Sequence, residues 1–270
     1  MIARATAHTR AGVSLAALVF GLALLAPWLA PFDPTLAVGP PSSAPSRQHW
    51  LGTNDIGQDI LSELLHGARS SLAVGLAAGL IATTVGVAAG LLAGARRGLV
   101  ASVVLRVADV VLVLPFLPLV IVLAAYVGTS RWQVATLLGG LMWARTARLV
   151  QALTRAEVSR DYVLAAHAAG ASLIRVLATH VGPAIAPLAV VQFTQAVGMA
   201  IALESSLAFL GLGDPTAKSW GTMLYYAQAR NAFLTGQWPW WVVPPGLMIA
   251  LSVLGFTLIG LGVTERRTRG

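Results

Sequence analysis

The feature that most constrains the fold is a series of long apolar stretches separated by short polar segments. About 20 apolar residues in a helix cross the hydrocarbon core of a bilayer. The chain offers six stretches of that order: residues 11–30, 73–95, 99–127, 132–153, 184–212 and 242–263. Charged residues make up only 10% of the chain, against about 25% in soluble domains, which is too little to cover a soluble surface. The sequence therefore predicts an all-α integral membrane protein with six transmembrane helices.

The first apolar stretch has two interpretations. A cleaved signal peptide would carry basic residues, here Arg4 and Arg10, before an apolar core, and small residues near the cleavage point, as in residues 26–30. The run is long for such a core, however, and Trp28 near its end is an aromatic residue suited to the membrane interface. We favour a retained first span.

The positions of the basic residues indicate a topology. A net charge of +8 is compatible with a nucleic-acid partner, but the arginines flank apolar stretches instead of clustering on one soluble face. Alternating six spans places twelve basic residues on the side of the N-terminus and five on the other. The twelve are Arg4, Arg10, Arg96, Arg97, Arg145, Arg148, Arg155, Arg160, Arg175, Arg266, Arg267 and Arg269, and the five are Arg47, Arg69, Arg131, Lys218 and Arg230. Because basic residues concentrate in cytoplasmic loops, both termini are predicted to be cytoplasmic, and we expect contact with membrane lipid and not with nucleic acid.

Residues 161–183 form an alanine-rich segment with polar edges on the predicted cytoplasmic side. The spacing predicts two short helices joined at Gly170, since glycine ends a helix in the left-handed conformation without a Cβ penalty. Ser172 is expected to cap the second helix and Pro183 to end it. Four alanines leave a nearly bare helix surface that permits close approach of a partner: Ala165, Ala166, Ala168 and Ala169.

The segment between the first two spans is predicted to be external. Residues 31–49 are rich in proline and serine and indicate an extended loop. Residues 51–72 have the pattern of a short amphipathic helix capped by Thr53 or Asn54. The span that follows contains glycines at four-residue spacings, which expose backbone for close helix packing.

Two acidic residues within the apolar stretches are candidates for a transport pathway. Arg106 lies three residues before Asp109 on the same helix, which favours a local ion pair, and Pro115 and Pro118 should bend this helix. Glu204 needs a partner or water, because an unpaired charge in a membrane is costly. We expect it either to line a pathway or to pair with a partner subunit.

Residues 161–183 resemble the cytoplasmic EAA loop of permease subunits in ATP-binding cassette (ABC) importers. That loop has an acidic residue, two alanines, a glycine four positions after the second alanine, and a proline further on. Ala165, Ala166, Gly170 and Pro183 fit this pattern. Leu164 stands where the loop has its glutamate, so a salt bridge assigned to that glutamate is not expected here.

Two further strings resemble the dipeptide, oligopeptide and nickel branch of these importers. The first shares with the branch pattern Leu51, Gly52, Thr53, Gly57, Asp59, Ser62, Gly67, Arg69, Ser71 and Leu72. The second shares Glu204, Leu207, Phe209, Leu210, Gly211, Leu212, Gly213, Pro215, Trp220, Gly221, Met223 and Leu224. Together with the EAA-like segment, the matching strings span about two-thirds of the chain.

The resemblance implies the C-type permease of a type I ABC importer in a bacterial cytoplasmic membrane. Its partners would be a second permease, two cytoplasmic ATPase subunits and an extracytoplasmic substrate-binding protein. ATP and magnesium would be bound by the ATPases, and this chain would hold no cofactor. The implied coupling site for the ATPase is Asp161, Tyr162, Ala165, Ala166, Gly170, Ala171, His180 and Pro183. The candidates for the pathway or its gate are Glu204, Phe209 and Asp109.

This reading divides the chain into four regions. Residues 1–30 would be a cytoplasmic tail and the first span, and residues 31–69 an external loop with the short amphipathic helix. Residues 70–264 would be the permease core of five spans, including the coupling loop at 157–183. Residues 265–270 would be a cytoplasmic tail.

The sequence lacks the residues that several other functions require. No glycine-rich phosphate loop ending in Lys-Ser or Lys-Thr occurs, no cysteine is present, and the spacing of the histidines fits no helical metal pair. No Ser–His–acid set stands out either, so we expect no enzyme activity and no metal site. Peptides are the first choice of substrate, and nickel or a metal chelate is the second. An ion-coupled secondary transporter and a membrane-embedded enzyme are more distant alternatives.

Overall fold

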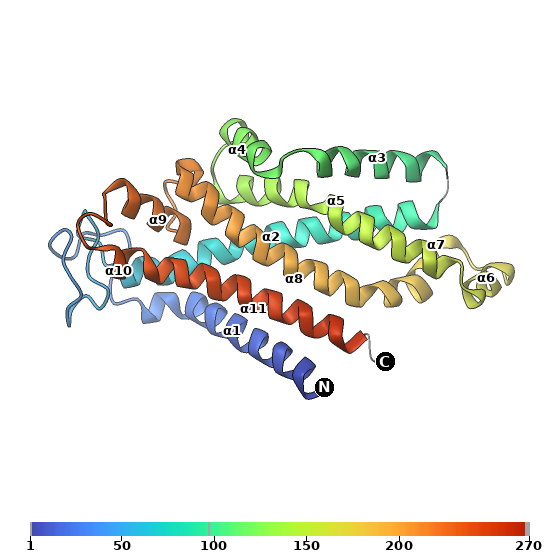
Figure 1. Cartoon of the computed structure of the whole chain (residues 1–270), viewed down its shortest axis with the longest axis horizontal. Coiled ribbons are helices and arrows are strands. Elements are labelled where there is room, and N and C mark those ends of the chain that lie inside the picture. Colours follow the sequence, from blue (N-terminus) through green and yellow to red (C-terminus); the bar gives the residue numbers. More distant parts are fainter. Residues whose placement is uncertain (1, 97, 268–270) are drawn as a thin grey trace.

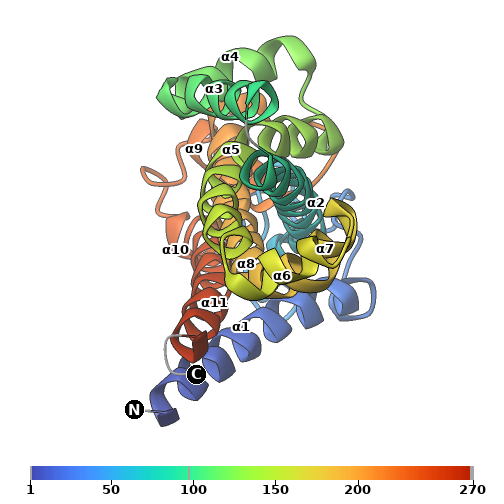
Figure 2. The ribbon, with the colours of Figure 1, turned by 90° about the vertical axis from the view of Figure 1, so that its right-hand side faces the viewer.

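The computed structural model describes residues 2–96 and 98–267, which form helices and loops with one isolated backbone bridge between Thr53 and Asp59. Five long helices in this part run roughly along one axis (Figure 1): α1 (Ile2–Leu29), α2 (Ile60–Ala95), α5 (Arg131–Val158), α8 (Gly182–Leu207) and α11 (Val243–Arg267). Figure 2 places α3 (Leu99–Val113) and α4 (Phe116–Val127) at one edge of this bundle, and α1 with α11 at the other.

The six predicted spans correspond to α1, α2, the α3–α4 pair, α5, α8 and α11. Within the described residues, four helical segments are long and apolar enough to cross a membrane: Ala7–Leu29, Ile60–Ala95, Leu173–Leu212 and Trp238–Glu265. The α3–α4 pair adds a fifth if it is one span. With 28 residues α5 is also long enough, but its arginines make it less apolar. The predicted all-α membrane fold is confirmed.

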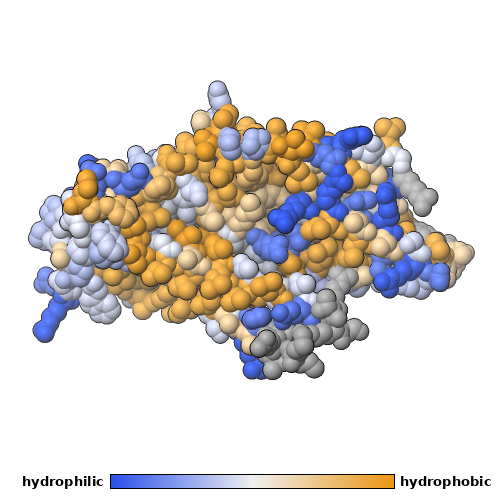
Figure 3. Space-filling view, viewed as in Figure 1, coloured by the Kyte–Doolittle hydropathy of each residue, from blue (hydrophilic) through white to orange (hydrophobic). Residues whose placement is uncertain are grey.

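The two ends of the bundle are formed by different segments. The loop between α1 and α2, α9 (Trp220–Ala229) and α10 (Trp238–Trp241) lie at one end, which we call the loop end (Figure 1). At the opposite end, the hairpin end, lie α6 (Asp161–Ala168) and α7 (Leu173–Val176). On the face seen in Figure 3, apolar side chains cover much of the middle of the bundle, and hydrophilic ones gather toward both ends.

The start of α2 differs from the prediction. The expected short amphipathic helix and the second span form one continuous helix of 36 residues, because no proline interrupts it. Its N-cap is Asp59, whose carboxylate accepts hydrogen bonds from the backbone N–H (2.8 Å) and the hydroxyl (2.7 Å) of Ser62. Thr53 and Asn54, the expected caps, lie in the preceding loop, where Asn54 Oδ1 accepts a bond from the backbone N–H of Gln58 (2.9 Å).

The prolines break the third span as predicted. α3 ends at Val113, α4 begins at Phe116, and the two helices are bent by 95°. Leu114 and Pro115 have extended backbone (ψ 138° and 108°). For Leu114 this follows because the residue before a proline avoids the helical region. Pro118 lies in the first turn of α4, where its missing N–H has no helical acceptor to lose.

The predicted local ion pair in α3 is wrong. Asp109 pairs with Arg148 of α5 and not with Arg106. α3 packs along α5, so the Arg148 side chain reaches the carboxylate from the neighbouring helix, whereas Arg106 would have to fold back along its own. The pair ties the two helices together.

Glycines hold the helices at close range, as their spacing predicts. A Cβ at Gly90 of α2 would lie 2.6 Å from Val150 Cβ and 2.7 Å from the Ala147 carbonyl oxygen of α5. The glycines one turn before and after Gly90 are equally close to α5. A Cβ at Gly12 of α1 would lie 2.8 Å from the Gly255 carbonyl oxygen of α11. Backbone therefore packs against backbone or Cβ, as small residues allow in membrane bundles.

The charges that mark the predicted topology fall in part outside the described residues. Arg97 of the basic turn and residues 268–270 of the predicted cytoplasmic tail are among these. α11 reaches Arg267.

Candidate functional site

The predicted coupling segment forms a helical hairpin, residues 161–176, which we call the hairpin. Gly170 follows α6 with φ +86°, and the backbone N–H of Ala171 returns to the Ala166 carbonyl (3.0 Å), the bond pattern of a helix that ends in a left-handed residue. Ser172 caps α7, its hydroxyl accepting a hydrogen bond from the Arg175 backbone N–H (3.4 Å). The predicted turn and cap are confirmed.

Pro183 does not end the second helix, contrary to the prediction. α7 passes into a π-helical turn (Leu177–Val181) that leads directly into α8, with Pro183 at its second position. The backbone N–H of Gly182 bonds to the Leu177 carbonyl, so the backbone widens just before the proline and makes room for its ring. A continuous helical backbone therefore connects the hairpin to α8.

One face of the hairpin is packed on the bundle. A cluster of buried residues joins α6 and α7 to α5, α8 and the π-helical turn: Val150, Val163, Val176, Val181 and Ile185. Each of these side chains is at most 1% exposed. Ala166 and Ala171 pack against the edge of the cluster. The hairpin is thus anchored to the membrane helices by apolar burial.

Glu157, near the end of α5, anchors the start of α6. It is 5% exposed, accepts a hydrogen bond from the Tyr162 hydroxyl, and pairs with Arg160 (Nε to Oε2, 3.2 Å). The bond to Glu157 raises the pKa of Tyr162, so the phenol remains a donor at neutral pH. The ring of His180 lies 5.8 Å from that of Tyr162.

Glu157 was not singled out as a site residue from the sequence. The signal that identifies it is its register on α5. It follows Val150 and Thr154 at spacings of four and three residues, which places a carboxylate on a buried helix face. A charge in such a place requires partners, and both a cation, Arg160, and a hydroxyl donor, Tyr162, follow it closely in the sequence.

The opposite face of the hairpin is exposed and largely apolar. Leu164 is 52% and Ile174 80% exposed, and Asp161, Ala165 and Ala168 are exposed as well. Figure 2 shows α6 and α7 in front, at the tip of the bundle. An anchored segment with bare alanines and exposed apolar side chains suits contact with a protein partner.

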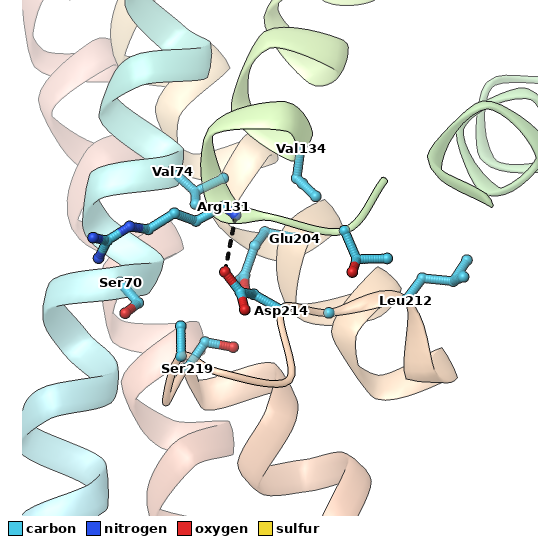
Figure 4. Close-up of a pocket in the computed structure, with 11 residues that line it drawn as sticks. Ser70, Val74, Arg131, Val134, Glu204, Leu212, Asp214 and Ser219 are labelled. Carbon is cyan, nitrogen blue, oxygen red and sulfur yellow. Dashed lines mark hydrogen bonds between the residues drawn. The ribbon is translucent and has the colours of Figure 1, made fainter. Parts of the chain in front are cut away.

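Glu204, the first pathway candidate, is buried within this chain. Its Oε2 accepts hydrogen bonds from the hydroxyls of Ser71 on α2 (3.2 Å) and Ser205 (3.4 Å). The Ser71 oxygen also accepts a bond from the Trp220 backbone N–H (3.3 Å). Glu204 and Asp214 line a small cavity of about 10 Å³, and Figure 4 shows their side chains on the same side of the site. The carboxylate thus joins α2, α8 and α9.

The other two pathway candidates lie in different surroundings. Phe209 is 37% exposed in a π-helical turn (Ala208–Leu212) that Gly211 distorts with φ +84°. Asp109 faces Arg148. The two acidic candidates therefore have different partners, Arg148 of α5 for Asp109 and Ser71 of α2 for Glu204.

A buried ion pair at the loop end connects segments far apart in the sequence. Lys218, in the loop before α9, contacts the Glu63 carboxylate in the first turn of α2 and donates a hydrogen bond to Gln58 Oε1 (2.7 Å). The side chains of Glu63 and Lys218 are 4% and 22% exposed. The sequence offers no signal for this pair, because its members are separated by 155 residues.

The fold is that of a polytopic membrane protein with a partly exposed hairpin at one end of its helix bundle. Within the described residues no group of three His, Asp or Glu side chains lies together as a metal site requires. The family model of the binding-protein-dependent transport system inner membrane component matches residues 86–267, and the chain belongs to this family.

Relatives extend the match over almost the whole chain. The dipeptide transport system permease protein DppC of Escherichia coli (strain K12) is 40% identical over 264 residues, which is 94% of this chain and 86% of the relative. The di/tripeptide transport system permease protein DppC of Pseudomonas aeruginosa (strain UCBPP-PA14) is 38% identical, over 94% of this chain and 85% of the relative. The chain is therefore a permease subunit of an ABC importer, a multi-pass protein of the bacterial inner membrane.

Proposed function

We propose that this chain forms half of the membrane pathway for short peptides in an ATP-driven importer. The observation that carries the choice of substrate is the 40% identity, over 94% of the chain, to a permease named for dipeptide transport. Nickel, the alternative substrate, has no comparable support among the relatives reported above. The second half of the pathway is a related permease, and a substrate-binding protein delivers the peptide at the loop end.

Two separate ATPase subunits bind ATP and magnesium and dock at the hairpin end. The hairpin is the coupling element, and its exposed face meets the ATPase. Its buried face rests on α5 and α8 through the cluster around Val163 and Val176. A partner shifts a conformational equilibrium only by its different affinity for the two states. A rigid hairpin on a continuous helix provides such a difference, because movement of the docked ATPase displaces α8 directly.

The proposed orientation has the hairpin end in the cytoplasm, and single cysteines test it. The chain has no native cysteine, so Ala168→Cys on the hairpin and Gln48→Cys at the loop end each introduce one exposed thiol. An impermeant maleimide should label Gln48→Cys in spheroplasts, and Ala168→Cys only after the membrane is opened. The reverse pattern would invert the topology.

Uptake by the reconstituted importer tests the function. Proteoliposomes that contain this chain, the second permease, the ATPases and the binding protein should accumulate a labelled dipeptide in an ATP-dependent manner. Omitting the second permease should abolish uptake, because six spans leave little room for a peptide path within one chain. Full uptake with this chain as the sole permease would refute the heterodimer. Uptake of nickel but not of peptide by the full assembly would refute the substrate.

A further inference from the structure

A cavity of about 620 Å³ opens at the loop end of the chain. Its walls come from the start of the loop after α1, from α2, from the first residues of α5 and from the loop before α9. Its charged and titratable side chains are His66, Arg69, Arg131, Asp214 and Lys218. A volume of this order lies within the range of about 300–1,000 Å³ that small-molecule sites occupy. The sequence strings that match the importer branch include Arg69 but assign no role to it or to Arg131.

Two of these cations are available to a ligand. Lys218 is already paired with Glu63, and His66 Nδ1 lies 3.0 Å from the Ser62 carbonyl oxygen. Arg69 and Arg131, in contrast, take part in none of the ion pairs formed within residues 2–96 and 98–267. The cavity wall therefore presents two guanidinium groups without a bound carboxylate.

The wall around Arg131 is built from specific contacts. The backbone N–H of Arg131 donates to Asp214 Oδ2 (3.4 Å), and its guanidinium lies 5.5 Å from the centre of the Trp132 ring. In Figure 4 the Arg131 side chain extends from the start of α5 toward Ser70 on α2. The guanidinium is thereby directed across the cavity wall, toward the helix that carries Arg69.

Asp214 gives the cavity one negative charge. Burial raises the pKa of this carboxyl, but hydrogen bonds from the side chain and backbone of Thr216, together with Arg131, more than offset that effect, so the pKa is lowered. Asp214 is therefore ionised at neutral pH. Lys218 is neutralised by Glu63, but Arg69 and Arg131 still outnumber Asp214 in the lining, so the cavity favours an anion, while the aspartate disfavours a multiply charged one.

We infer that Arg69 and Arg131 bind the terminal carboxylate of the peptide as it enters the pathway from the binding protein. Guanidinium groups bind planar carboxylates through paired, charge-assisted hydrogen bonds. A concave site of this size fits the end of a short peptide, and its net charge fits a single carboxylate. The inference rests on the proposed peptide transport and adds the chemistry by which this subunit recognises its substrate.

Uptake by the full assembly, at saturating loaded binding protein, provides the test. Arg69→Gln and Arg131→Gln should each lower uptake of a free dipeptide about tenfold, and the double variant should lower it further, because each loses a charge-assisted contact. ATP hydrolysis stimulated by the binding protein should stay within twofold of wild type.

Uptake of the dipeptide amide, which has no terminal carboxylate, should be the same in the wild type and the double variant. Arg47→Gln is the matched control. Arg47 is an exposed cation at the loop end that does not line the cavity, so this variant should transport normally.

Other outcomes would overturn the inference. Normal dipeptide uptake by the double variant would exclude a role for the two arginines. A parallel loss of stimulated ATP hydrolysis would assign them to docking of the binding protein, and an effect that vanishes in vesicles without anionic lipids would assign them to lipid headgroups. Failure of the proposed function is a separate result, because the wild-type assembly would then take up no dipeptide at all.

Discussion

Replacing Gly170 with valine should uncouple the ATPases from transport. Gly170 has φ +86°, and nothing lies within 4 Å of the place where its Cβ would be, so the substitution acts through the backbone alone. A β-branched residue in this region is strained by about 1–3 kcal/mol, enough to lower the equilibrium constant for the native turn by about fivefold to a hundredfold or more. Peptide-stimulated ATP hydrolysis and uptake in proteoliposomes should fall, by up to the same factor.

Assembly in the membrane should survive this substitution, because the cluster that anchors the hairpin is untouched. The yield of the permease pair after detergent extraction should therefore match the wild type. Gly21→Val is the matched control, since Gly21 is helical and also has nothing within 4 Å of its added Cβ, so uptake should be close to normal.

A second variant separates docking from the turn. Ala165 is exposed on α6, so Ala165→Trp should block the ATPase sterically while the turn stays intact. The neighbouring Ala166 is unsuitable, because it packs against the buried cluster and a tryptophan there would also disturb the anchor. If Gly170→Val and Ala165→Trp both transport at the normal rate, the hairpin is not the coupling element.

Sequence reasoning succeeded where the deciding interactions are local. The turn at Gly170, the cap at Ser172 and the break at Pro115 each depend on a residue and its close neighbours, and all three are found in the structure. Pro183 is the instructive exception. Its effect on the helix depends on the preceding backbone, where a π-helical turn accommodates the proline ring. No residue pattern predicts such a turn.

Contacts between helices could not be predicted from the sequence, because they depend on how the helices pack. Asp109 could pair with Arg106 on its own helix or with Arg148 on α5. It pairs with Arg148 because α3 packs on α5. For the coupling site, the resemblance predicted which segment is involved, but only the structure shows which face of it is buried and which is exposed. Of the two partners of Glu157, Arg160 is local, in an i,i+3 pair, whereas Tyr162 is brought to the carboxylate by the turn between α5 and α6.

The ion pair between Glu63 and Lys218 shows how strongly such a distant contact can affect stability. The Glu63 carboxylate is almost completely buried, and Lys218 is its cationic partner. Removing one member of a buried pair leaves the other charge uncompensated, at a cost of about 3–5 kcal/mol. The position of Glu63 in the first turn of α2 offsets part of this cost, because a helix N-terminus favours a negative charge.

Lys218→Met should therefore destabilise the folded chain by about 3 kcal/mol, the lower end of that range, measured as a loss of thermal stability of the purified permease in detergent. Arg230→Met is the control, because the Arg230 side chain, which pairs with Asp55 (2.8 Å) at the same end, is 58% exposed, and solvent-screened pairs contribute at most about 1 kcal/mol. Adding Glu63→Gln to Lys218→Met should restore most of the lost stability, since a neutral amide costs far less to bury than an unpaired carboxylate. A double variant no more stable than Lys218→Met alone would show that lysine packing, and not the buried charge of Glu63, holds the loop before α9 on α2.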